Sequence, residues 1–146
     1  MTPDQIERCA RIICDARKAN RFVENLADEL TPRTLEDGYA VQARLLQMLG
    51  EPTAGYLLGL TNEYMQKIFG VDGPYSSPIL KSNIHASPAR FKRGELLTRG
   101  LECEIAFRMA ENLPPRGRDY TVDEVGGAVA MMFPAIEVVN AHFPKW

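Results

Sequence analysis

The stretch from residue 101 to residue 109 is the main indication of the fold, because apolar side chains alternate in it with mostly charged ones. It reads Leu101-Glu102-Cys103-Glu104-Ile105-Ala106-Phe107-Arg108-Met109. Successive side chains of an extended strand point to opposite faces, so the alternation predicts a β-strand with one apolar face and one face carrying charge. Glu102 and Glu104 then project from the same face, about 7 Å apart at the backbone.

A third acidic residue, Glu137, lies inside the apolar run Ala135-Ile136-Glu137-Val138-Val139. Two glutamates on a strand are by themselves typical of a solvated face. Glu137 is different, because its run is predicted to be a strand buried on both faces, where an ionised carboxylate is costly unless it is paired or bound to a metal. Three carboxylates on two strands could share one cation, and all-oxygen ligation favours Mg²⁺ or Mn²⁺ over zinc. The alternative is an ion pair between Glu137 and Arg108 across the sheet.

The N-terminal part of the chain predicts helices. Thr2 and Gln5 form a capping box for a first helix, and the segment Thr31-Pro32-Arg33-Thr34 begins a second helix that ends at Gly50. Residues 54–60 are apolar and bounded by glycine, which predicts a buried strand. A short helix capped by Thr61 or Asn62 then runs to Phe69.

The C-terminal part predicts strands separated by loops. Residues 71–100 are interrupted by proline and glycine, so we expect mostly loop, with brief strands near residues 79–80 and 90–91. A capping box at residues 121–124 begins a helix that is expected to extend through Met132. Pro134 is expected to separate that helix from a last strand over residues 135–139. Helices early and strands late indicate the α+β class.

Composition restricts the class of protein further. The chain has 146 residues, 45% of them apolar and 25% charged, with a formal net charge of −2. These values predict a soluble globular protein of one domain, or one domain and part of another, with no nucleic-acid partner. No signal peptide or membrane-spanning stretch is apparent, so no membrane partner is expected. Three cysteines, an odd number without a C-x-x-C pair, predict reduced thiols in a cytoplasmic protein.

Four motifs, in the same order, resemble the 2-keto-4-pentenoate hydratase / 4-oxalocrotonate decarboxylase group of the fumarylacetoacetate hydrolase superfamily. That group has an Ala-Tyr-x-Val-Gln helix, a Gly-Tyr-Lys-Ile-Gly-Leu-Thr strand, a Val-Glu-x-Glu-Ile-Ala-Phe strand and a Pro-Ala-Ile-Glu-Ile-Val strand. The matching stretches of this chain are residues 35–42, 55–61, 101–107 and 134–139.

The resemblance implies a fold, a metal site and an activity. The fold would be N-terminal helices packed on a mixed β-sheet, an incomplete fumarylacetoacetate-hydrolase-like fold. Residues 1–70 would form a small helical or αβ N-terminal region, and residues 71–146 the first part of a β-rich catalytic domain that is truncated at its C-terminus. Glu102, Glu104 and Glu137 would bind Mg²⁺ or Mn²⁺. The activity would be hydration of 2-hydroxypenta-2,4-dienoate (2-oxopent-4-enoate) substrates from aromatic catabolism, or alternatively 4-oxalocrotonate-type decarboxylation.

The chain also departs from the family pattern. Leu57 stands where the family strand has a lysine, so the catalytic group is left unassigned, and Tyr75 replaces an acidic residue of the following turn. Leu57, Tyr75 and Ser77 are the expected residues of the substrate pocket. Family members also continue well beyond the final motif, so we expect a homo-oligomer or a complementing subunit. A truncated, catalytically weakened subunit that acts in binding or assembly is the third hypothesis.

Overall fold

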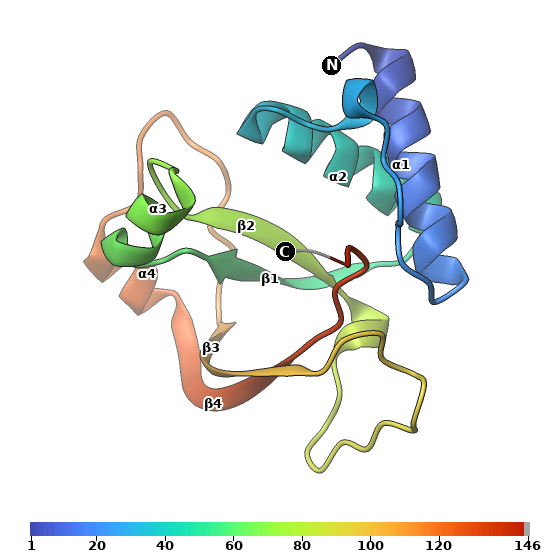
Figure 1. The fold of residues 1–146 in the computed structure, drawn as a ribbon. Helices are drawn as coiled ribbons and strands as arrows, with labels where there is room; N and C mark the ends of the chain where they lie inside the picture. The colour runs from blue at the N-terminus through green and yellow to red at the C-terminus, as the bar shows by residue number, and fades with distance from the viewer. Residues whose placement is uncertain (145–146) are drawn as a thin grey trace. The chain divides into compact units, whose positions relative to one another are not determined.

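The computed structural model describes residues 1–144, which form two compact units (Figure 1). The first unit contains Met1–Glu95 and the segment that begins at His142, and the second contains Leu96–Ala141. The boundary between the units therefore follows Glu95, whereas the division expected from the sequence follows residue 70. The strands on either side of residue 70 pair with each other, which keeps them in one unit.

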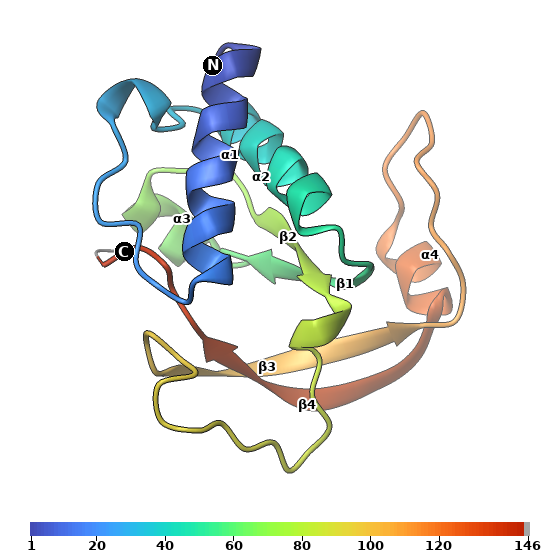
Figure 2. The same ribbon diagram turned by 90° about the vertical axis from the view of Figure 1, so that its right-hand side faces the viewer.

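Two helices, α1 (Pro3–Lys18) and α2 (Leu35–Leu49), pack side by side in the first unit (Figure 2). Both begin as the sequence predicts, α1 with a capping box at Thr2 and Gln5, and α2 with the Thr34 side chain accepting a hydrogen bond from a backbone amide. Their contact, together with the 3₁₀ turn η1 (Asp28–Leu30), forms a small core. The buried members of this core are Cys9, Ala10, Cys14, Leu30, Val41 and Leu45.

The first unit also contains a two-stranded antiparallel sheet of β1 (Thr53–Gly59) and β2 (Tyr75–Leu80). The short helix α3 (Glu63–Phe69), capped by Asn62, connects the two strands, and the 3₁₀ turn η2 (Lys81–Asn83) follows β2. The expectation that β1 is buried was wrong, because Tyr56 and Leu58 are 67% and 63% exposed. Residues 90–91 form no strand and lie in an irregular loop.

The second unit is a two-stranded antiparallel ribbon of β3 (Gly100–Met109) and β4 (Val129–Val139), with the short helix α4 (Val122–Gly127) before β4. The helix expected through Met132 ends at Gly127, and β4 continues through Pro134 to Val139. Proline lacks the amide that a central strand would donate. It is tolerated in β4 because β3 is the only strand paired with β4 in the described chain.

The ribbon is more exposed than the sequence indicated. Ile136 is 67% exposed, so the last strand is not buried on both faces, and Cys103 of β3 is exposed as well. The structure confirms the α+β class, with two small antiparallel sheets in place of one mixed sheet. No helix within residues 1–144 is both long enough and apolar enough to span a membrane.

Candidate metal centre

Three glutamates meet on one face of the β3–β4 ribbon. Glu102 of β3 lies directly opposite Glu137 of β4, and directly opposed residues of an antiparallel pair share a face. Glu104 lies two residues further along β3 and therefore points to the same side. One carboxylate oxygen from each of the three residues lies within 4.8 Å of the others.

These carboxylates have no cationic partner among the residues that the structure describes. Among residues 1–144, none of the three forms an ion pair with lysine or arginine. The alternative pair between Glu137 and Arg108 is therefore wrong, and the Arg108 guanidinium instead lies 5.9 Å from the centroid of the Phe133 ring. Within the described part of the chain, the cluster thus holds like charges that no side chain neutralises.

The neighbouring carboxylates change the pKa of Glu137. Glu104 and Glu137 are half-buried, while Glu102 is exposed. Burial raises the pKa of Glu137 above its ordinary value, and the neighbouring charges of Glu102 and Glu104 raise it further. A cation held among the three carboxylates would remove the repulsion that disfavours the ionised form.

The residues fit a hard divalent cation. Oxygen ligands lie about 2.0–2.6 Å from Mg²⁺ or Ca²⁺, so two ligands on opposite sides of one ion are at most about 4–5 Å apart. The 4.8 Å limit among the glutamate oxygens falls within the reach of Ca²⁺. Ligands of Mg²⁺ are at most about 4.2 Å apart, so glutamate oxygens at that limit would move slightly closer to bind it. Carboxylate ligands without sulfur or imidazole suit magnesium, calcium or manganese better than zinc.

The residues expected to line the substrate pocket lie in the other unit. Leu57 of β1 is half-buried and lies opposite Ser77 of β2. Tyr75 lies opposite Gly59, and its ring occupies the space that a Cβ atom at Gly59 would need. The structure therefore brings Leu57, Tyr75 and Ser77 together in the β1–β2 sheet, and their role in a pocket stays a prediction.

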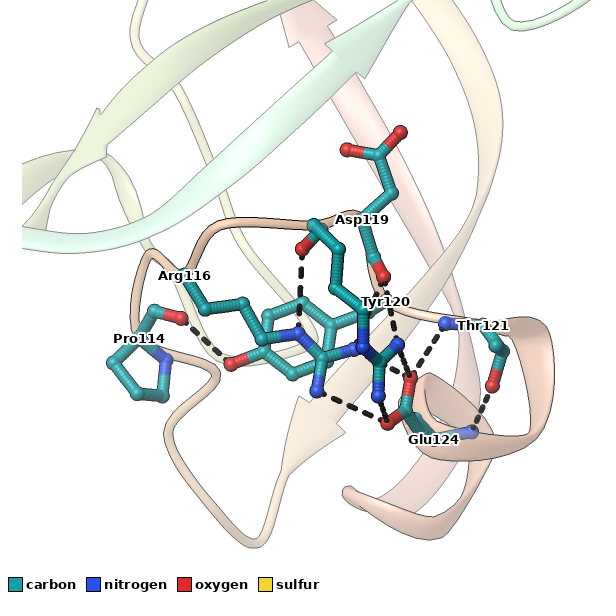
Figure 3. Close-up of polar contacts among 7 residues, drawn as sticks. Pro114, Arg116, Asp119, Tyr120, Thr121 and Glu124 are labelled. Carbon is teal, nitrogen blue, oxygen red and sulfur yellow. Dashed lines mark hydrogen bonds and ion pairs between the residues drawn. The ribbon is translucent and has the colours of Figure 1, made fainter.

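A second polar cluster, in the loop between β3 and α4, was missed by the sequence analysis (Figure 3). Arg116 and Arg118 both form ion pairs with Glu124, and together they lower the pKa of Glu124 to about 2. The Arg116 guanidinium also lies 3.6 Å from the centroid of the Tyr120 ring, whose hydroxyl donates to the Pro114 carbonyl. The sequence identified Glu124 as a capping residue, but nothing in a capping pattern predicts its arginine partners. The cluster links α4 to the loop that precedes it through two ion pairs.

Comparison with curated proteins finds relatives with one kind of activity, although no family model matches the chain. The chain is 28% identical over its whole length to a 2-keto-4-pentenoate hydratase of Paraburkholderia xenovorans, and it covers 55% of that protein. It is 26% identical to the TodF product hydratase of Pseudomonas putida, of which it covers 53%. It is 27% identical to a 2-oxo-hept-4-ene-1,7-dioate hydratase of Escherichia coli, of which it covers 50%. The chain thus spans about half the length of these relatives.

Solved structures give the same likeness at the level of the fold. The 4-oxalocrotonate decarboxylase from Pseudomonas putida G7, complexed with magnesium and adipate, matches all of this chain with a TM-score of 0.86 at 19% identity. The same enzyme complexed with calcium and acetate matches 98% of the chain with a TM-score of 0.85. The chain corresponds to 56% of each of those structures. The fold class and the resemblance to this group of proteins are therefore confirmed.

Proposed function

We propose that this chain carries the divalent metal centre of a hydratase that adds water to 2-hydroxypenta-2,4-dienoate-type substrates. The observation that carries the proposal is the convergence of the Glu102, Glu104 and Glu137 carboxylates on one face of the ribbon. The similarity to three hydratases supports the reaction class. The magnesium and calcium complexes of the decarboxylase support a divalent cation at such a centre.

In this proposal the three glutamates hold Mg²⁺ or Mn²⁺. The cation would act as a Lewis acid that stabilises negative charge developing on a substrate oxygen. Antiparallel pairing fixes Glu102 against Glu137, so the backbone holds these two ligands in position before the cation binds. Glu102 is the exposed member of the set, which leaves its side of the cluster accessible to a small molecule.

Hydration is favoured over decarboxylation by the sequence relatives. The hydratases are 26–28% identical to this chain, whereas the decarboxylase structures are 19–20% identical. Decarboxylation of a 4-oxalocrotonate-type substrate is the second candidate, because the decarboxylase shares the fold with a TM-score of 0.86. Either reaction would place this chain in aromatic catabolism. We further propose a cytoplasmic location, in agreement with the free thiols of its three cysteines.

Leu57 favours a third candidate, a binding or assembly subunit with weakened catalysis. Leucine can neither transfer a proton nor stabilise a charge, so the lysine function of the family strand is not supplied at this position. We assign no catalytic acid or base. The homo-oligomer or complementing subunit expected from the sequence stays a prediction.

The metal centre is tested by calorimetric titration of the purified chain with Mg²⁺ and with Mn²⁺. Loss of a residue that only supports a metal ligand weakens metal binding by about 10- to 100-fold. We expect Glu137→Gln to weaken metal binding by more than that, because the substitution removes the charge of a ligand itself. Glu111→Gln is the matched control, since Glu111 is an exposed glutamate of the same unit outside the cluster. Equal affinities for the two variants, or no binding at millimolar metal, would contradict the proposed centre.

The reaction is tested by ultraviolet assay of 2-hydroxypenta-2,4-dienoate and of 4-oxalocrotonate with the metal present. Consumption of the dienoate supports the hydratase, and release of CO₂ from 4-oxalocrotonate supports the decarboxylase. Metal binding without turnover of either substrate would leave the binding subunit as the function of this chain.

A further inference from the structure

The face of the ribbon that carries the three glutamates also carries an arginine further along β3. The antiparallel register places four cross-strand pairs on this face, one after another. They are Glu102 with Glu137, Glu104 with Ala135, Ala106 with Phe133, and Arg108 with Met131. Carboxylates therefore occupy one end of the face, apolar side chains its middle, and a guanidinium its other end.

Arg108 has no acidic partner in the part of the chain that the structure describes. Within residues 1–144, its guanidinium forms no ion pair with an aspartate or a glutamate. It lies 5.9 Å from the centroid of the Phe133 ring, and Phe133 belongs to the neighbouring pair on the side of the glutamates. An exposed arginine is ordinarily a solvated charge, but this one shares a face with the proposed metal centre.

The middle of the face suits a carbon chain. Ala106, Phe133 and Ala135 have no polar side-chain atom, and all three are half-buried. Glu104 and Arg108 are four residues apart, about 13 Å at the backbone, and their long side chains can span part of that distance. A ligand that reaches both ends of the face therefore needs a short carbon chain with an anionic group at each end.

We propose that Arg108 binds a second carboxylate of the substrate, so that this chain prefers dicarboxylic dienoates to 2-hydroxypenta-2,4-dienoate. The inference rests on the proposed function, because the other end of the substrate would lie at the metal centre. It adds the substrate class and the residue that selects it. Arginine binds a carboxylate through two parallel charge-assisted hydrogen bonds, and a dienoate with an uncharged end offers it no such acceptor.

The selectivity is tested by calorimetry, at millimolar Mg²⁺, with two probes that differ at one end. 2-Oxoadipate and 2-oxohexanoate share the 2-oxo acid and the number of carbon atoms, but 2-oxoadipate alone has a second carboxylate. We expect the unaltered chain to bind 2-oxoadipate about tenfold more tightly than 2-oxohexanoate. This is the lower end of what hydrogen bonds to charged groups contribute, because Arg108 is exposed. Arg108→Gln should abolish the difference between the two probes.

Arg99→Gln is the matched control for the binding test. Arg99 is an exposed arginine of the same unit that forms no ion pair in the described chain, and it directly precedes β3 at the end nearer the glutamates. The two substitutions remove the same charge, so a general attraction of the dianion would be weakened by both. Arg108→Met, which keeps an unbranched side chain without the charge, is the second variant should Arg108→Gln fail to fold.

Turnover separates this inference from the proposed activity. Preference for 2-oxoadipate that depends on Arg108, without turnover of any dienoate, supports the role of Arg108 and counts against the hydratase. Turnover of 2-hydroxypenta-2,4-dienoate, with equal affinity for the two probes, overturns this inference alone. In an active chain, we expect Arg108→Gln to lower kcat/KM about tenfold for 2-hydroxyhexa-2,4-dienedioate and to leave it unchanged for 2-hydroxypenta-2,4-dienoate.

Three further results would overturn the role of Arg108. The first is the absence of 2-oxoadipate binding at millimolar concentrations of the probe. The second is a preference for 2-oxoadipate that persists in folded Arg108→Gln or Arg108→Met. The third is an equal loss of that preference in Arg99→Gln, which would assign it to the overall charge of the unit.

Discussion

At the scale of single residues, the glutamate cluster is held together by backbone pairing at an electrostatic cost. Glu102 and Glu137 are opposed in the ladder, and like charges directly opposite one another destabilise a sheet. The raised pKa of Glu137 is the direct consequence of this placement and of burial. In the proposed metal centre, a bound cation would offset this cost, because no lysine or arginine within residues 1–144 pairs with the three glutamates.

Leu57 stands where the family strand has a lysine, so its substitution tests the proposed chemistry. We expect Leu57→Lys to raise dienoate turnover by about a hundredfold, the lower end of what acid–base catalysis contributes. Leu58→Lys is the control, because Leu58 is the next residue of β1 and points to the exposed face of the strand. Steady-state assays at saturating Mg²⁺ measure the change. Equal turnover by the two variants would show that a lysine at position 57 has no catalytic role in this chain.

Glu124 gives the clearest pH dependence among single residues. Its pKa is lowered from 4.5 to about 2 by hydrogen bonds from Arg116 and Arg118, so the folded state favours the ionised carboxylate. The stabilisation is complete above the unfolded pKa of 4.5 and is lost as the pH falls toward 2. We expect Glu124→Gln to lower the melting temperature at pH 7, and the difference from the unaltered chain to shrink below pH 4.5.

Asp123→Asn is the control for the Glu124 experiment. Asp123 lies in the same first turn of α4, so it shares the helix-dipole contribution, but it forms no ion pair in the described chain. A pH-independent difference for Glu124→Gln, or the same loss in Asp123→Asn, would mean that the two arginines do not stabilise the loop.

At the scale of elements, the ends of the helices follow directly from local sequence. Helix α2 ends because Gly50 adopts a left-handed conformation with φ of 67°, and its amide donates to the Leu46 carbonyl. A residue with a Cβ atom is strained in that conformation, whereas glycine is not. Helices α1 and α4 both begin with a threonine capping box.

Gly38 within α2 and Gly50 directly after it provide a test, because alanine at the two positions should change the free energy of unfolding in opposite directions. We expect Gly50→Ala to lower the free energy of unfolding by about 1–2 kcal/mol, because alanine is strained in the left-handed conformation. Gly38→Ala should raise it by about 0.5–1 kcal/mol, because Gly38 lies within the helix and an added Cβ atom would meet no neighbouring atom within 4 Å. Urea denaturation measures both. The same sign for both variants would contradict the assigned end of α2.

At the scale of the whole molecule, metal binding should stabilise one unit selectively. All three glutamates belong to the unit Leu96–Ala141. A ligand that binds only the folded state adds about 2.7 kcal/mol when its concentration is about 100 times its dissociation constant. We therefore expect Mg²⁺ to slow amide exchange in β3 and β4 and to have little effect on α1. Protection that rises equally in α1, or that persists in Glu137→Gln, would argue against a site on the ribbon.

The sequence by itself determined the elements that depend on local chemistry. The capping residues located the starts of α1, α2 and α3, and the alternation over residues 101–109 predicted β3 and the shared face of Glu102 and Glu104. These features depend on neighbours within a few residues, so they are visible without the fold. The confirmed resemblance came from the same kind of short motif.

Only the tertiary structure decided which distant residues meet. The pairing of β4 with β3 extended a strand through Pro134, set Glu137 opposite Glu102, and left Cys103 on an exposed face. The loop after β3 likewise brought two arginines to Glu124. Register and burial depend on contacts between segments far apart in the chain, so hydrophobic patterning alone does not reveal whether an apolar face of a strand is covered or exposed.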